Sequence, residues 1–118
     1  FSMERDGIDH TQELLSIPKL IVVVAYNLAV SEMEGFATIN KVAAEAQQKG
    51  YQVIGLSASG PDEVSMLKEK FDVAFDFYFC DMTALKTIVR SNPAVMEWHS
   101  GTIKQKLHWN DALELKLQ

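Results

Sequence analysis

The chain has 118 residues, of which 47% are apolar, and a formal net charge of −5 at neutral pH. Such a length and composition are typical of one globular domain and exclude a disordered tail. The single cysteine, Cys80, excludes an intramolecular disulfide and a four-cysteine zinc site. The acidic balance argues against nucleic acid as a partner, since phosphate backbones attract basic proteins.

The chain begins Phe1-Ser2-Met3 instead of with methionine. We therefore expect residues 1–118 to be a single domain taken from a longer polypeptide. The longest apolar run, Leu20 to Ala25, is far shorter than the ~20 residues that a membrane helix needs.

The first predicted elements form a hairpin and a short helix. Asp6-Gly7 is a strong turn signal between extended stretches at 1–4 and 8–10, because both residues tolerate positive φ. Thr11 is expected to cap the helix with its hydroxyl, and Pro18 ends it.

A buried strand and an amphipathic helix follow. Leu20 to Tyr26 is a continuous apolar run without alternation, typical of a strand covered on both faces. Ser31 and Glu34 fit a capping box, and Gly50 suits the left-handed position after the helix end. The helix carries one apolar stripe with helical spacing: Phe36, Ile39, Val42, Ala43 and Ala46.

The second strand is expected at 51–57, and a helix starts at Gly60-Pro61. Its predicted buried side is formed by Val64, Leu67 and Phe71. The next strand alternates apolar and polar residues, which predicts one strongly apolar face formed by Phe75, Phe77 and Phe79.

The C-terminal part is expected to contain a helix, a hairpin and a last short helix. Asp81 caps the first of these helices, and Asn110 the last. Two strands, Ala94 to Trp98 and Thr102 to Trp109, flank a tight turn at Ser100-Gly101. A two-residue turn places 99 opposite 102, 93 opposite 108, and Glu97 opposite Lys104.

Strand–helix–strand units make parallel strands, and the terminal hairpin adds antiparallel ones. The sequence thus predicts an α/β fold with a mixed sheet and helices on both faces.

Several segments in this order resemble a thioredoxin-like domain, most closely the branch of the TlpA-type thiol-disulfide proteins and peroxiredoxins. They are the Asp-Gly turn, Lys19 to Tyr26, Gln47 to Gly50, Val53 to Ser57, the proline before Ala94 to Trp98, and Gly101-Thr102-Ile103. The resemblance covers nearly the whole chain. It implies a thioredoxin-like three-layer sandwich with an N-terminal β-hairpin.

Two segments also resemble the soluble C-terminal region of some bacterial DoxX-family membrane proteins: Gly7 to Leu15, and Phe79-Cys80-Asp81 running into Leu85-Lys86-Thr87 and Arg90 to Pro93. This resemblance implies that the domain is tethered to a bacterial inner membrane, on a side that it leaves open. The implied partner is a membrane-helix region of the same polypeptide or another protein.

The segment that carries the redox cysteines in such domains departs from the family pattern. Residues 27–35 read Asn-Leu-Ala-Val-Ser-Glu-Met-Glu-Gly, without cysteine, and Glu32 and Glu34 would raise the pKa of a nearby thiol. We expect disulfide exchange of the family type to be absent, and a binding or scaffolding role in its place.

The alternative function is that of a single-cysteine redox or peroxide-responsive enzyme, with Cys80 as its reactive thiol. It precedes the helix that opens at Asp81, and a helix N-terminus favours thiolate. The competing interpretation is a structural cysteine at a strand end, beside a carboxylate that disfavours thiolate. Exposure of the sulfur would separate the two.

Pro93 corresponds to the cis-proline of thioredoxin-like domains. The resemblance implies a cis bond between Asn92 and Pro93, and a peptide- or thiol-docking groove formed with Tyr26 and Asn27. The other interpretation is that the proline is kept only because the turn into the strand requires it.

The remaining candidates predict no metal and no cofactor. His99 and His108 would lie roughly 30 Å apart on the hairpin ladder at ~3.3 Å per residue, too far to share an ion. The sequence has no Gly-rich phosphate loop and no nucleophile elbow. Met96, Trp98 and Trp109 are either part of the core or an exposed docking patch.

Overall fold

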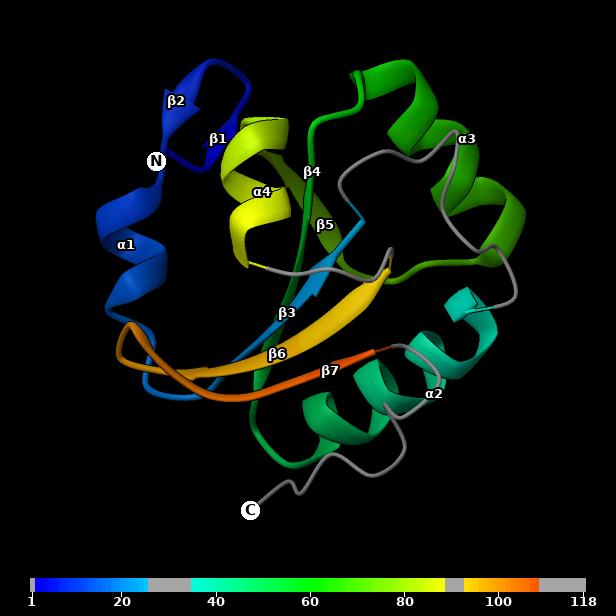
Figure 1. The fold of residues 1–118 in the computed structure, drawn as a ribbon. Helices are drawn as coiled ribbons and strands as arrows, with labels where there is room; N and C mark the ends of the chain where they lie inside the picture. Colours follow the sequence, from blue (N-terminus) through cyan, green and yellow to red (C-terminus); the bar gives the residue numbers. More distant parts are fainter. Residues whose placement is uncertain (1, 26–34, 89–92, 109–118) are drawn as a thin grey trace.

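The computed structural model describes residues 2–25, 35–88 and 93–108. They form a seven-stranded sheet in the order β2-β1-β5-β4-β3-β6-β7, with helices on both faces (Figure 1). The elements are β1 (Glu4–Arg5), β2 (Ile8–Asp9), α1 (Thr11–Leu15), β3 (Leu20–Val24), α2 (Gly35–Gln48), β4 (Gln52–Ser57), α3 (Pro61–Phe71), β5 (Asp76–Phe79), α4 (Met82–Ile88), β6 (Ala94–His99) and β7 (Thr102–His108).

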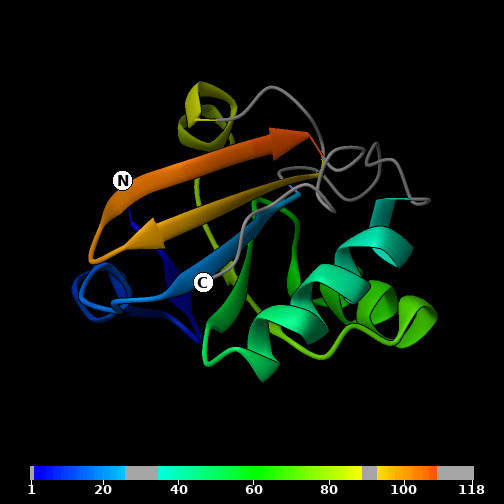
Figure 2. The ribbon, with the colours of Figure 1, turned by 90° about the horizontal axis from the view of Figure 1, so that it is seen from below.

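The sheet is mixed, as predicted. β3, β4 and β5 run parallel, while β6 is antiparallel to β3 and β1 is antiparallel to β5. All five residues of β3 are buried, because it lies in the sheet between two helical layers and therefore needs no polar face. The sheet separates α4 from α2 and α3 (Figure 2).

Two apolar clusters hold the layers together. One packs α2 and α3 against one face of the sheet, and its members include the whole predicted stripe of α2, from Phe36 to Ala46. The other joins α1 and α4 to the opposite face through Leu14, Leu85 and Trp98. Gly50 has a φ of 86° after α2, as the left-handed position requires.

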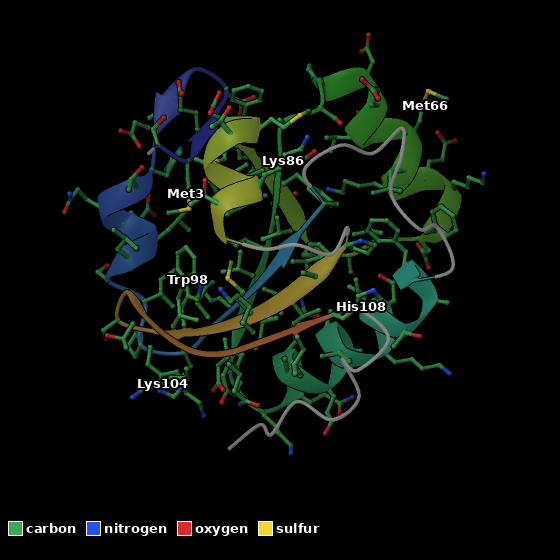
Figure 3. All side chains as sticks on the ribbon, in the orientation of Figure 1. Met3, Met66, Lys86, Trp98, Lys104 and His108 are labelled. Carbon is green, nitrogen blue, oxygen red and sulfur yellow. The ribbon has the colours of Figure 1, made fainter. Side chains whose placement is uncertain are left out.

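Trp98 belongs to the core and forms no docking patch. Its side chain is 3% exposed and points inward, as does Met3, whereas Met66 and Lys104 point away from the molecule (Figure 3). Trp109, the capping box at 31–34 and the last predicted helix lie outside the described residues.

The predicted cap of the first helix is wrong by one position. Thr11 is the first residue of α1, and His10 occupies the N-cap position. Asp9 provides the acceptor instead, because its Oδ1 receives hydrogen bonds from both the amide and the hydroxyl of Thr11. The Thr11 hydroxyl oxygen in turn accepts the amide of Met3, which joins α1 to the hairpin.

The third predicted phenylalanine of β5 is not in the core. Phe75 and Phe77 are buried, whereas Phe79 is 49% exposed. Phe79 lies beside the two-stranded hairpin, where Glu4 is its partner on β1. α4 begins just beyond it, and Asp81 caps this helix as predicted, by accepting the amide of Ala84 at 3.3 Å.

The C-terminal hairpin has the predicted turn but a different register. His99 pairs with Thr102 across Ser100-Gly101, and a β-bulge then shifts the ladder by one residue. Glu97 therefore faces Gln105 and not Lys104, and His108 faces Ala94 and not residue 93. The predicted Glu97–Lys104 pair is wrong because a two-residue turn fixes the register only up to the first irregularity.

Within the described ranges, the helices are all too short and too polar to cross a lipid bilayer.

Candidate functional site

The first candidate site lies at the end of β3, where the sequence predicted a docking groove. Val24 pairs with Ala94, so the residues that adjoin them, Ala25 and Pro93, lie at the same end of two neighbouring strands. Both are buried. Tyr26, Asn27, Asn92 and the bond between 92 and 93 lie outside the described residues, so the groove stays a prediction.

Cys80 is positioned by the junction of β5 and α4. Its amide donates to the Ser57 carbonyl of β4 at 3.0 Å, and its side chain packs among Met3, Leu56 and Leu85. The side chain has no exposed surface.

Burial raises the pKa of the Cys80 thiol and outweighs the hydrogen bond from the Asp81 amide that would lower it. The helix N-terminus therefore does not produce a thiolate here. A neutral, enclosed sulfur is a structural group. Cys80 is also separated from the end of β3 in the sheet, because β4 lies between β3 and β5.

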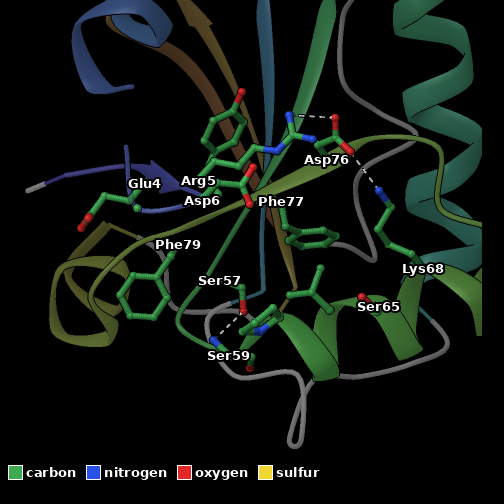
Figure 4. Close-up of a pocket in the computed structure, with 14 residues that line it drawn as sticks. Glu4, Arg5, Asp6, Ser57, Ser59, Ser65, Lys68, Asp76, Phe77 and Phe79 are labelled. Atoms are coloured by element: carbon green, nitrogen blue, oxygen red, sulfur yellow. Dashed lines mark hydrogen bonds and ion pairs between the residues drawn. The ribbon is translucent and has the colours of Figure 1, made fainter. Parts of the chain in front are cut away.

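The second candidate site is a groove between the N-terminal hairpin, α3 and β5, with a cavity of about 490 Å³ (Figure 4). Its lining comprises Glu4, Arg5, Asp6, Gly7, Ser57, Ser59, Pro61, Val64, Ser65, Lys68, Asp76, Phe77, Tyr78 and Phe79. Aromatic side chains, hydroxyls and charges of both signs therefore meet in one place. We call this site the β5 groove.

Asp76 links the two walls of the β5 groove. Its Oδ2 lies 3.2 Å from Arg5 Nη1 of the hairpin, and its Oδ1 accepts a hydrogen bond from Lys68 Nζ of α3 at 2.9 Å (Figure 4). The bond from Lys68 lowers the pKa of Asp76, although partial burial opposes it. Asp76 therefore forms ion pairs with both basic residues of the lining, Arg5 and Lys68.

A third cluster surrounds Glu97, whose side chain is buried in the middle of β6. Its carboxylate accepts hydrogen bonds from the Tyr51 hydroxyl at 2.7 Å, from His99 Nε2 at 2.6 Å, and from the Gln105 amide. Burial would raise the pKa of Glu97, but these donors outweigh it and hold the pKa below its ordinary value.

Sequence reasoning missed both the β5 groove and the Glu97 cluster. The groove joins segments from residue 4 to residue 79, so it has no local motif. Glu97 did leave a signal, since it is a charged residue between apolar neighbours in β6, and a buried carboxylate is stable only with hydrogen-bond donors around it. In the described residues, no three His, Cys, Asp or Glu side chains gather as metal ligands would.

No protein-family model and no curated protein matches the sequence. Solved structures do match. The chain is similar to a thiol-disulfide oxidoreductase from Bacteroides fragilis, with a TM-score of 0.72 and 14% identity over 97% of this chain and 91% of that one. The thioredoxin domain of a thiol-disulfide oxidoreductase from Bacteroides vulgatus gives 0.71 and 13%, over 96% and 86%.

Reduced Prx3 from Vibrio vulnificus also matches, with a TM-score of 0.67 and 10% identity over 90% of this chain and 79% of that one. At these identities the likeness concerns the fold alone. The domain therefore has the thioredoxin-like fold of thiol-disulfide oxidoreductases.

Proposed function

We propose that this domain is a thioredoxin-like binding or scaffolding module that does not catalyse thiol–disulfide exchange. The observation that carries the proposal is the state of Cys80, the only thiol of the chain, whose side chain has no exposed surface and whose pKa is raised. Exchange needs an accessible thiolate that attacks a disulfide sulfur. A second thiol to resolve the mixed disulfide does not exist in this chain.

The alternative is a single-cysteine thiol enzyme that uses Cys80. Such an enzyme would have to expose the sulfur during turnover, which would open the buried apolar cluster that Cys80 shares with Met3, Leu56 and Leu85. The burial of Cys80 opposes this opening, and it is the reason for preferring the binding module.

Insulin reduction and peroxide consumption test the proposal directly. We expect the purified domain to show the same rates as the Cys80→Ser variant, equal to the background without protein. A rate above background that disappears in Cys80→Ser would overturn the proposal in favour of the single-cysteine enzyme.

The proposal includes tethering to a bacterial membrane protein. Its support is the resemblance of Gly7 to Leu15, and of the region from Phe79 to Pro93, to the soluble part of DoxX-family proteins. Fractionation of the full-length gene product tests it. Recovery in the membrane pellet after a high-salt wash is expected, and recovery in the supernatant contradicts tethering.

The proposed docking residues at the end of β3 remain Tyr26, Asn27, Asn92 and Pro93. Their support is the adjacency of Ala25 and Pro93 at one end of the sheet. An Asn92→Ala variant should lose affinity for a partner isolated with the full-length protein, and unchanged affinity would remove Asn92 from the site.

A further inference from the structure

On the outer edge of β5, the edge away from β4, only Phe79 pairs with a described residue of the neighbouring strand. The amide of Cys80 points to β4, where it donates to the Ser57 carbonyl. Because backbone groups alternate along a strand, Phe79 and Phe77 direct theirs to the opposite edge. Phe79 meets Glu4 of β1 there, but no described residue pairs with Phe77 on that side.

The hairpin explains why the pairing stops. Asp6 and Gly7 have φ values of 54° and 78°, and this two-residue turn sends the chain back directly after Arg5. β1 is therefore too short to continue along β5. The cavity of about 490 Å³ occupies the place where its continuation would lie, beside Asp76, Phe77 and Tyr78.

The charges around this edge favour a basic occupant. Arg5 and Lys68 are both engaged by Asp76. Glu4 and Asp6 also line the cavity, and neither forms an ion pair with any described residue. Glu4 accepts a hydrogen bond from the Ser2 hydroxyl at 3.1 Å, and the charge of Asp6 contributes to the raised pKa of Arg5. The lining thus carries three carboxylates against two basic side chains, in a chain that is itself acidic.

We propose that the β5 groove binds a basic, extended segment of another protein as an additional strand, antiparallel to β5. The segment would exchange backbone hydrogen bonds with Phe77, place apolar side chains on the face of the exposed ring of Phe79, and direct lysine or arginine from its opposite face to Asp6 and Asp76. This inference rests on the proposed binding function and names its partner class.

Arg5 has a distinct role in this proposal. Its side chain reaches along the edge to Asp76 (Figure 4) and covers part of the stretch that the added strand would occupy. Charged side chains commonly protect exposed strand edges against unwanted pairing. The bound segment must displace Arg5, so Arg5→Gln should strengthen binding, since it removes both the obstacle and a like charge.

The test uses two capped eight-residue peptides with alternating valine and a charged residue, lysine in one and glutamate in the other. Titration is followed by amide NMR shifts and by hydrogen exchange of Phe77. We expect the lysine peptide to shift and protect Phe77, and the glutamate peptide to have no effect. Affinity should fall with added salt.

Two variants identify the contacts, and a third is the control. Asp6→Asn should weaken the binding of the lysine peptide by ~2- to 5-fold, as loss of an exposed ion pair does, and asparagine tolerates the positive φ at position 6. Phe79→Ala should also weaken it. Met66→Ala is the matched control, because Met66 is 70% exposed on α3 and does not line the cavity.

Equal binding of both peptides, weaker binding by Arg5→Gln, or shifts that avoid β5 would overturn the proposal. Protection of Phe77 by self-association in the absence of peptide would overturn it in favour of a second copy of the chain. The insulin assay reports separately on the proposed redox silence, so failure of the peptide test leaves that conclusion standing.

Discussion

The Tyr51 hydroxyl donates a hydrogen bond to Glu97 Oε2 over 2.7 Å, and this bond joins the residue before β4 to the middle of β6. β3 lies between these two strands in the sheet. Both side chains are almost completely buried. The bond therefore crosses the central strand on the α2 face and ties together parts of the chain that are not neighbours in the sheet.

Replacing Tyr51 by phenylalanine removes this donor and keeps the ring in the core. A buried carboxylate that loses a hydrogen bond becomes less stable, so we expect Tyr51→Phe to lower the free energy of unfolding by about 1–3 kcal/mol. Urea denaturation followed by circular dichroism measures the change. If Tyr51→Phe lowers the free energy of unfolding no more than a substitution at an exposed position does, the bond contributes little.

Glu97 should make the fold sensitive to acid. Its pKa is lower in the folded protein than in the unfolded chain, so the unfolded state binds a proton first as the pH falls. The stabilisation is fully present above the ordinary glutamate pKa of about 4.3 and is lost as the pH falls through the lower folded value.

In Glu97→Gln, the denaturation midpoint should consequently vary less between neutral and acid pH. The exposed Glu69→Gln, on α3, is the control and should leave the pH dependence unchanged. Some dependence should remain in Glu97→Gln, because the pKa of Asp76 is lowered as well. An unchanged acid slope would contradict the role given to Glu97.

Gly55 in β4 is required by the ring of Phe77 in β5. A Cβ at position 55 would lie 2.5 Å from two ring carbons of Phe77, closer than any real contact. Gly55→Ala must therefore displace a buried ring, and we expect a loss of about 1–3 kcal/mol. Gly60→Ala is the control, since nothing lies within 4 Å there, and it should change stability by less than about 1 kcal/mol.

Cys80 should react slowly with maleimide in the folded protein and rapidly in denaturant. Burial shields the sulfur and raises its pKa, so both the access and the thiolate fraction are reduced. A titration of the reaction rate should give a midpoint above the ~8.5 of an ordinary cysteine. Fast labelling at neutral pH would show a reactive thiol.

The order of elements could be predicted from the sequence because each element carries a local signal. Asp6-Gly7 has the chemistry of a tight turn, and the continuous apolar run of β3 indicates a strand between two layers. The spacing in α2 identified its buried stripe correctly. These features depend on residues close together in the chain.

The errors concern features that depend on distant residues. Phe79 alternates like a core residue, but it lies next to a hairpin too short to cover it. The β5 groove combines three separate segments, and the side chains around Glu97 come from β6, β7 and the start of β4. No local pattern contains such information.

The bulge between Glu97 and Trp98 also determines which layer the end of β7 joins. With the uninterrupted register, Leu107 would lie opposite Ala94 and face α4, and Lys106 would face the cluster around α2. The extra residue inverts this arrangement, so Leu107 lies opposite Val95 and packs on the α2 side. Deleting Lys104 would therefore exchange a leucine for a lysine at the edge of the core.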